Sequence, residues 1–247
     1  DKGNVFRFIG YYGHYGTWTE TNRALSNLSS AYVFTGDPKY ARKAALVLYR
    51  VAQFYPDMDY GFWANLGFKN SDGGSGKGKI YGRIWESGLV DIFATTYDAI
   101  YPGITDTDLV AAISKQAGQK VDPVDVQQLV TKNILYQIHD GIINRLIEGN
   151  EGMYQHSMAT AAVVLDEPGT SEDWLDWIFK DGDVRHTGEG GGNMNGIFRS
   201  KVDDDGMGDE ASPAYNSIWR SLFRSISDII ALYPSYKRNS FVDNPKY

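Results

Sequence analysis

The chain of 247 residues contains no cysteine, which excludes disulfides, thiolate metal sites and a cysteine nucleophile. It also lacks any apolar run near the length of about 18 residues that a membrane-spanning helix needs. No basic patch or stripe of the kind found in nucleic-acid-binding proteins is present, and the formal net charge is −7. We therefore expect neither a membrane protein nor a partner of nucleic acids.

Sustained strand alternation and exact internal repeats are also missing, whereas apolar residues recur at helical spacing through most of the chain. With 42% hydrophobic residues, the chain can form one good-sized core or two small ones. Helices are expected over residues 20–34, 38–54, 84–101, 105–117, 122–147, 150–165, 171–179 and 212–232. Residues 181–210, rich in glycine and aspartate, are expected to be loop, with a weak strand pair near 197–202.

The first two expected helices are separated only by a short Gly-Asp-Pro turn. Asp37 is a typical N-cap and Pro38 suits the first helical position, so the linker forces an antiparallel hairpin. We therefore predict an all-α fold built of antiparallel helix hairpins, which is typical of an α/α solenoid or toroid.

Aromatic side chains make up 14% of the residues, and they gather just before the first expected helix. The segment from Tyr11 to Trp18 includes His14 and Tyr15 and is broken by glycines, which makes it too irregular for a core strand. One interpretation is a wall on which sugar rings stack. The other is a packed N-terminal arm.

A second group of polar side chains opens the mid-chain helix at residues 149–156. Asn150 is a standard N-cap residue, and His156 has the alternative interpretation of a hydrogen-bonded core histidine. Asn150, Gln155 and His156 nevertheless lie within two turns of one helix end, where exposed N–H groups and the helix dipole favour a bound carboxylate.

The third segment is an acidic glycine loop that leads into a Ser-Pro helix start, with Tyr215 in the first turn. The acidic residues are expected to form a solvated loop. A structural calcium ion on Asp203, Asp205 and Asp209 is an alternative, although their spacing does not fit an EF-hand. No cofactor is required by the chemistry described below.

Three ordered motifs resemble the heparinase II/III-like and alginate-lyase superfamily of polysaccharide lyases. They are the opening hairpin over residues 22–44, Asn150-Glu-Gly-Met-Tyr-Gln, and Asp209-Glu-Ala-Ser-Pro-Ala-Tyr215-Asn. The resemblance implies an incomplete α/α toroid, usually followed by a β-sandwich. Residues 1–247 would form a single catalytic domain, truncated on its C-terminal side and belonging to a larger, secreted or periplasmic bacterial enzyme.

The same resemblance implies that Tyr215 is the catalytic tyrosine and that Asn150 binds the substrate carboxylate. Glu151 and Asn216 stand where many members have histidine, so the second catalytic histidine would be His156, His186 or a residue beyond Tyr247. Further substrate-binding candidates are Gln155, Glu151, Tyr154, Arg83, Trp18, His14, Tyr15 and Arg199.

These residue types suit β-elimination from a uronic-acid polymer, with unsulfated alginate favoured. Amide and imidazole donors can stabilise the carboxylate as it gains enolate character, without a metal. A base removes the C5 proton and an acid protonates the departing O4, and one tyrosine can do both when the two positions are syn. To act as a base, Tyr215 needs a pKa below its usual value of about 10, and a nearby positive charge from Arg199 or Arg220 would lower it.

Two other functions remain open from the sequence. A toroidal glycoside hydrolase would use paired carboxylates, for which Glu86, Glu151, Asp209 and Glu210 are candidates. A non-catalytic helical sugar-binding module would explain the wealth of tyrosine and tryptophan without any acid or base.

Overall fold

The computed structural model describes residues 8–64, 75–184, 190–242 and 244–247. Within these residues every regular element is a helix, so the predicted all-α class is confirmed, and only isolated bridges join extended segments. The chain forms two compact units, residues 1–137 and 138–247. No helix in the described ranges is both long and apolar enough to cross a membrane.

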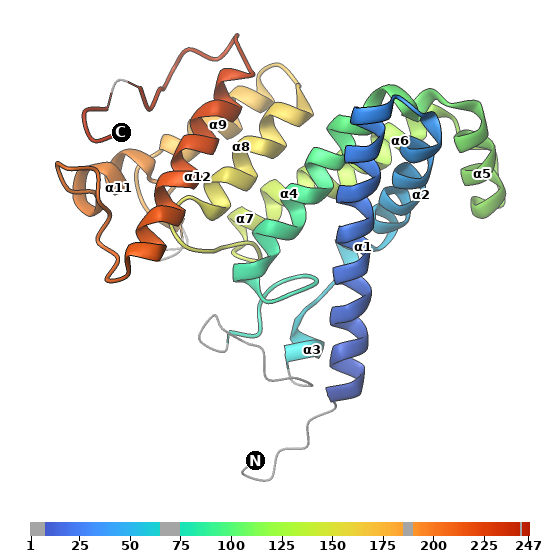
Figure 1. Ribbon diagram of the computed structural model, residues 1–247, viewed down its shortest axis with the longest axis horizontal. Coiled ribbons are helices and arrows are strands. Elements are labelled where there is room, and N and C mark those ends of the chain that lie inside the picture. The colour runs from blue at the N-terminus through green and yellow to red at the C-terminus, as the bar shows by residue number, and fades with distance from the viewer. Residues whose placement is uncertain (1–7, 65–74, 185–189, 243) are drawn as a thin grey trace. The chain divides into compact units, whose positions relative to one another are not determined.

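Unit 1 is built around the three longest helices of its half of the chain (Figure 1). Its elements are α1 (Phe8–Thr35), α2 (Pro38–Phe54), η1 (Tyr55–Asp57), α3 (Gly61–Ala64), α4 (Arg83–Ile100), η2 (Tyr101–Thr105), α5 (Thr107–Ala117), α6 (Pro123–Val130), the π-helical turn η3 (Thr131–Leu135) and the start of α7 (Tyr136–Ile143). Helix α1 packs against both α2 and α4, and α2 also contacts α5 and α6.

The opening hairpin follows the sequence prediction. Asp37 caps α2, because its Oδ1 accepts the backbone N–H of Lys39 at 3.0 Å. Gly36 makes the turn in the left-handed region, with φ of 67°. One face of α2 is then buried through Ala41, Leu48 and other small or aliphatic residues.

The prediction that the first helix starts near residue 20 is wrong, because α1 already begins at Phe8. The aromatic segment before residue 20 is therefore helical and is neither a loop nor a non-helical arm. Tyr11, His14, Tyr15 and Trp18 occupy positions i, i+3, i+4 and i+7, which is the spacing of one helix face. Gly13 and Gly16 obscured this helical pattern in the sequence, because glycine lowers helix propensity. Neither glycine is required by packing, since an added Cβ would have no atom within 4 Å.

The helix expected over residues 122–147 is also corrected. It divides into α6, the π-helical turn η3 and α7, and it ends at Ile143. Asn133, within the π-helical turn, donates its side-chain amide to the carbonyl of Ala52 at 2.9 Å. A turn follows α7, in which Arg145 adopts a φ of 62° and pairs with the carboxylate of Glu148 at 2.7 Å.

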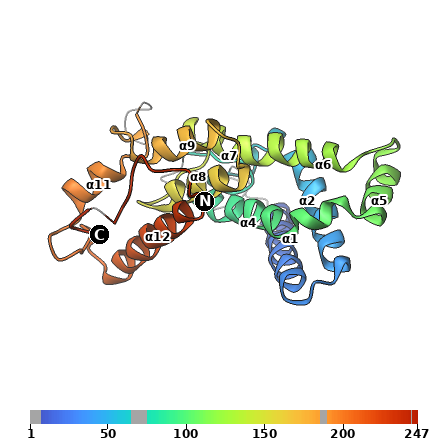
Figure 2. The ribbon, with the colours of Figure 1, turned by 90° about the horizontal axis from the view of Figure 1, so that it is seen from above.

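Unit 2 contains α8 (Met153–Leu165), α9 (Thr170–Phe179), α11 (Met194–Lys201) and α12 (Pro213–Ala231), together with the rest of α7. Helix α8 packs against α9 and against α12 (Figure 2). The expected loop over 181–210 is wrong at α11, where Met194, Ile197 and Phe198 are buried at helical spacing. The weak strand pair is absent there, and Val202 makes only an isolated bridge to Gly208.

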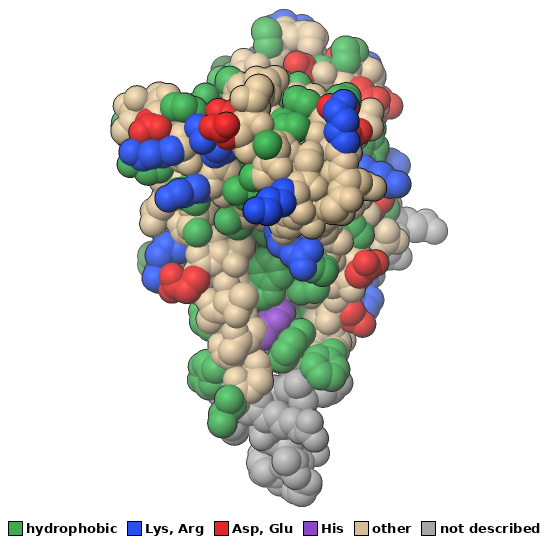
Figure 3. Space-filling view, turned by 90° about the vertical axis from the view of Figure 1, so that its right-hand side faces the viewer, with side chains coloured by type: hydrophobic (Ala, Val, Ile, Leu, Met, Phe, Trp, Pro, Cys, Tyr) green, Lys and Arg blue, Asp and Glu red, His purple; other side chains and the backbone are tan. Residues whose placement is uncertain are grey.

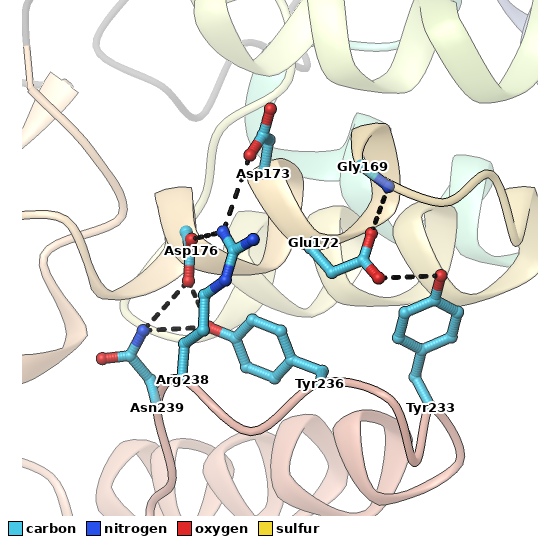
Figure 4. A network of polar contacts seen from close by, with 8 residues as sticks. All are labelled: Gly169, Glu172, Asp173, Asp176, Tyr233, Tyr236, Arg238 and Asn239. Carbon is cyan, nitrogen blue, oxygen red and sulfur yellow. Dashed lines mark hydrogen bonds and ion pairs between the residues drawn. The ribbon is translucent and has the colours of Figure 1, made fainter.

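The chain after α12 is tied to α9 by a polar network (Figure 4). Asp176 accepts hydrogen bonds from the Tyr236 hydroxyl at 2.8 Å and the Asn239 amide at 3.1 Å, and it pairs with Arg238. Burial raises the pKa of Tyr236, and its bond to Asp176 raises it further. Phe241, 2% exposed, completes the attachment by packing against aromatic rings of α9 and α11.

Candidate functional site

The predicted catalytic tyrosine lies in the first turn of α12. Ser212 precedes the helix in an extended conformation and Pro213 occupies its first position, which fixes where the helix begins. The Tyr215 side chain is 47% exposed, and its hydroxyl has no hydrogen-bond partner among the described residues. A phenol in this position is accessible to a substrate.

The polar group at residues 149–156 forms the entry to α8. Asn150 is not the N-cap that the sequence suggested, because α8 begins at Met153 and the capping position is Gly152, with φ of 93°. Gln155 completes the cap, since its Oε1 accepts the N–H of Gly152 at 2.9 Å. Its Nε2 donates to the carbonyl of Gly192 at 2.8 Å, so both polar ends of this fully buried amide are bonded within the protein.

Asn150 itself lies half-buried in the turn that leads to this cap. Glu151 is 6% exposed and forms an ion pair with Lys201 of α11 at 2.5 Å. Tyr154 is completely buried, with its ring edge-on to Trp177 at 6.2 Å. Among these neighbours in sequence, Asn150 is thus more accessible than Glu151 or Tyr154.

His156 is turned toward α12. Its Nε2 lies 2.9 Å from the Ser225 hydroxyl, and the side chain is half-buried. Ser225 follows Tyr215 by ten positions, which is about 15 Å along the helix axis. The His156 imidazole therefore contacts α12 far along the helix from the turn that holds Tyr215.

The entry to α8 packs closely on α12 near Leu222. A Cβ at Gly152 would lie 2.8 Å from the Leu222 Cβ, so the two backbones approach closely here. Leu222 and Tyr215 are seven positions apart, so they share one face of α12 and differ by about 10 Å along its axis. The Tyr215 phenol thus emerges from the face of α12 that packs on the α8 entry, two turns before that contact.

The residues predicted to form a sugar-stacking wall lie on helix α1 of unit 1. His14 bonds the carbonyl of Ile80 through Nε2 at 2.7 Å and stacks on Trp63 with ring centroids 4.2 Å apart. Burial lowers the pKa of His14, which favours the neutral imidazole. Trp18 lies edge-on to His14 at 6.5 Å, and Arg83, another predicted substrate contact, is half-buried at the start of α4.

A hollow of about 190 Å³ lies beside this wall, and we call it the aromatic pocket. It is mainly apolar and is lined by Tyr11, Tyr15, Asn22, Tyr60, Tyr81, Gly82, Trp85, Gly88 and Leu89. Tyr15 was predicted from the sequence, whereas Tyr60, Tyr81 and Trp85 were missed. Trp85, Gly88 and Leu89 are spaced i, i+3 and i+4, so they share one face of α4. This pattern could have indicated the pocket from the sequence, because a glycine there leaves room beside the exposed Trp85 indole.

The surface of the described residues in Figure 3 carries acidic and basic side chains interspersed, without an expanse of either sign. Hydrophobic side chains gather around a histidine in its lower part. On the described residues, the face seen in Figure 3 therefore carries no basic track for a polyanion.

Glu86 is a buried carboxyl group whose pKa is strongly raised. It is fully buried at the start of α4, and desolvation raises its pKa from 4.5 to about 7, although hydrogen bonds oppose the shift. Its Oε2 accepts the N–H groups of Ile80 and Tyr81 at 3.0 and 2.9 Å, and its Oε1 accepts the Tyr55 hydroxyl at 3.1 Å. These bonds attach the segment before α4 to the core.

The other predicted residues are placed as follows. Arg199 is exposed at the end of α11, with Asp181 at 3.4 Å, and His186 lies outside the described residues. In the loop of Asp203, Asp205 and Asp209, Asp205 accepts the N–H of Met207 at 3.0 Å. Over the described ranges, no group of three His, Cys, Asp or Glu side chains is arranged to hold a metal ion.

Comparison of the chain with protein-family models, with curated proteins and with solved structures gives no significant match.

Proposed function

We propose that the chain is the catalytic part of a polysaccharide lyase that cleaves a uronic-acid polymer by β-elimination, with alginate the favoured substrate. Tyr215 acts as the acid and, for a syn arrangement, also as the base. Asn150 donates a hydrogen bond to the substrate carboxylate as it becomes enolate-like. The helix hairpins belong to an incomplete α/α toroid, and the enzyme acts outside the cytoplasm, where such polymers occur.

The placement of Tyr215 carries this proposal. Its phenol is exposed, is not engaged in an internal hydrogen bond among the described residues, and emerges on the face of α12 that meets the α8 entry. Asn150 lies in that entry and is half-buried. The contact of the α8 entry at Leu222 lies roughly 10 Å along α12 from Tyr215, which is longer than one sugar ring, so the proposal requires the phenol and the Asn150 amide to extend toward each other over the same uronate.

The roles of the other candidates differ in this proposal. Gln155 supports the α8 entry through the cap of Gly152 and does not touch substrate. His156 holds the entry to α12 through Ser225. For a polymer that requires an anti elimination, the remaining histidine candidate for the base is His186.

The test is a panel of alginate, glucuronan, ulvan and glycosaminoglycans, followed by the near-ultraviolet absorbance of the unsaturated product. We expect product on one polymer and a loss of at least about 100-fold in rate for Tyr215→Phe, the contribution of one well-placed acid or base. Tyr101→Phe is the matched control, because Tyr101 is a similarly exposed tyrosine (49%) in η2 of unit 1.

A flat trace on every polymer, or full activity of the Tyr215→Phe variant, would contradict the proposal. Release of reducing ends without absorbance would instead indicate a hydrolase. Of its candidate carboxylates, Glu86 is fully buried and Glu151 is 6% exposed, so neither is positioned to touch a polymer. Oligosaccharide binding through the aromatic pocket without any turnover would identify a non-catalytic sugar-binding module.

A further inference from the structure

A second hollow lies in unit 2, along the side of α12, and we call it the Trp219 pocket. Its volume is about 580 Å³, and its lining includes Asn216, Trp219, Arg220, Phe223, Arg224 and Tyr247. Tyr215 is not part of the lining, although its chain neighbour Asn216 is. The pocket is therefore distinct from the exposed phenol but begins in the same turn of α12.

Two polar atoms of this lining are buried and have no hydrogen-bond partner. They are the indole Nε1 of Trp219, a residue only 3% exposed, and the Oδ1 of Asn216. The Asn216 amide nitrogen is fixed on the carbonyl of Glu210 at 2.9 Å, which leaves its oxygen free to accept. A buried donor and a buried acceptor without partners are costly, and a bound molecule with hydroxyl groups would satisfy both once the Trp219 and Asn216 side chains shift enough to expose these atoms to the pocket.

The charges at the pocket favour an anion. Arg220 is exposed and has no partner among the described residues, and Arg224 makes only a long contact, 3.8 Å, with Asp228. Lys246 is engaged, since its Nζ bonds the Val202 carbonyl at 2.6 Å. Lys246 also pairs with Asp204 at 3.5 Å, and the lining includes the acidic Asp205 and Asp228, so Arg220 is the cation of the lining whose charge is available to an anion.

We propose that the Trp219 pocket binds an acidic sugar unit. Arg220 pairs with its carboxylate, the Trp219 N–H and the Asn216 oxygen bond its hydroxyls, and the rings of Phe223 and Tyr247 contact its apolar face. The choice of ligand rests on the proposed function, in which the pocket holds a uronate unit next to the one at Tyr215. An unpartnered guanidinium together with an unpartnered indole N–H and an unpartnered amide oxygen fits an acidic sugar better than a neutral one.

The experiment titrates the whole chain with sodium glucuronate, glucose and sodium sulfate at matched ionic strength. Ligand-observed NMR measures binding and intrinsic tryptophan fluorescence reports the pocket. We expect glucuronate to bind and Arg220→Gln to weaken it by about tenfold or more, since a charge-assisted hydrogen bond is lost. Arg50→Gln, the same change at an exposed arginine of α2, should leave binding unchanged.

Trp219→Phe provides a second variant. The free protein loses no internal hydrogen bond by this change, because the indole N–H has none. The fluorescence response to glucuronate should disappear and the affinity should fall severalfold. Loss of affinity together with a lower urea midpoint for Arg220→Gln would indicate a folding effect and count against the proposal, since Arg220 is exposed and unpartnered.

The outcomes separate this inference from the lyase proposal. Equal binding of glucose and glucuronate, or an unaffected Arg220→Gln variant, overturns the inference. Sulfate that binds as tightly as glucuronate also overturns it, because the pocket would then recognise an anion without the sugar. Binding of glucuronate through Arg220 in a chain that yields no unsaturated product would overturn the lyase and leave the pocket assignment standing.

Discussion

Replacement of Glu86 by glutamine should remove a pH dependence from the stability of unit 1. The Glu86 carboxyl is fully buried, and burial raises its pKa from 4.5 to about 7. The folded chain therefore binds this proton more tightly than the unfolded chain does. The contribution of Glu86 to stability is highest below pH 4.5, declines as the pH rises from 4.5 to 7, and is constant above that range.

The size of the effect follows from the two pKa values. The difference between 4.5 and about 7 corresponds to about 3 kcal/mol of folding free energy lost on ionisation, at 1.36 kcal/mol for each pH unit. Glutamine stays neutral and can keep the local bonds. Its oxygen can accept the N–H groups of Ile80 and Tyr81, while its amide donates to the Tyr55 hydroxyl oxygen.

The assay is urea-induced unfolding of the wild type and of Glu86→Gln between pH 4 and pH 8, followed by circular dichroism. We expect the variant to gain stability relative to the wild type by about 3 kcal/mol across this range, with most of the change between pH 4.5 and 7. Glu20→Gln is the control, because the Glu20 side chain is 67% exposed. A difference between wild type and Glu86→Gln that does not vary with pH would refute the reasoning.

Two further predictions concern glycines. Gly88 lies inside α4 and an added Cβ meets nothing within 4 Å, so Gly88→Ala should raise the free energy of unfolding by about 0.5–1 kcal/mol, measured by urea unfolding. Gly88→Leu should keep the fold but fill the aromatic pocket, and unchanged oligosaccharide binding in that variant would show that the pocket is not used. Gly152 has a φ of 93° and would place a Cβ 2.8 Å from Leu222, so Gly152→Ala should lower the thermal midpoint and cost about 2 kcal/mol or more.

The all-helical class and most helix positions could be predicted, because they depend on local signals. The Asp37-Pro38 start of α2 and the Asp106 cap of α5 use side chains adjacent to the backbone groups that they bond. Errors arose where local signals were weak or mixed. Glycines within α1 and around α11 lower the local helix propensity and interrupt the apolar pattern of the sequence. These segments are helical because their apolar residues are buried in the core, which the local sequence does not show.

The candidate site divides in the same way. Residue type and order along the chain were enough to single out Tyr215 and the α8 entry, and the helix start at Pro213 follows from local chemistry. Which side chains are accessible was a matter of tertiary packing. Gln155 is bonded to Gly192, 37 positions away, and His156 to Ser225, 69 positions away, and neither partner could be read from spacing.

The two pockets and the raised pKa of Glu86 likewise exist only in the folded chain. The aromatic pocket joins residues of α1, the segment before α4, and α4 itself, and the Trp219 pocket joins α11, the acidic loop, α12 and the C-terminal residues. The sequence by itself determined that the chain is helical, where most of its helices form and which chemical groups are available. The tertiary structure decided which groups lose their water, because desolvation depends on every segment that packs around them and not on the nearest neighbours in the chain.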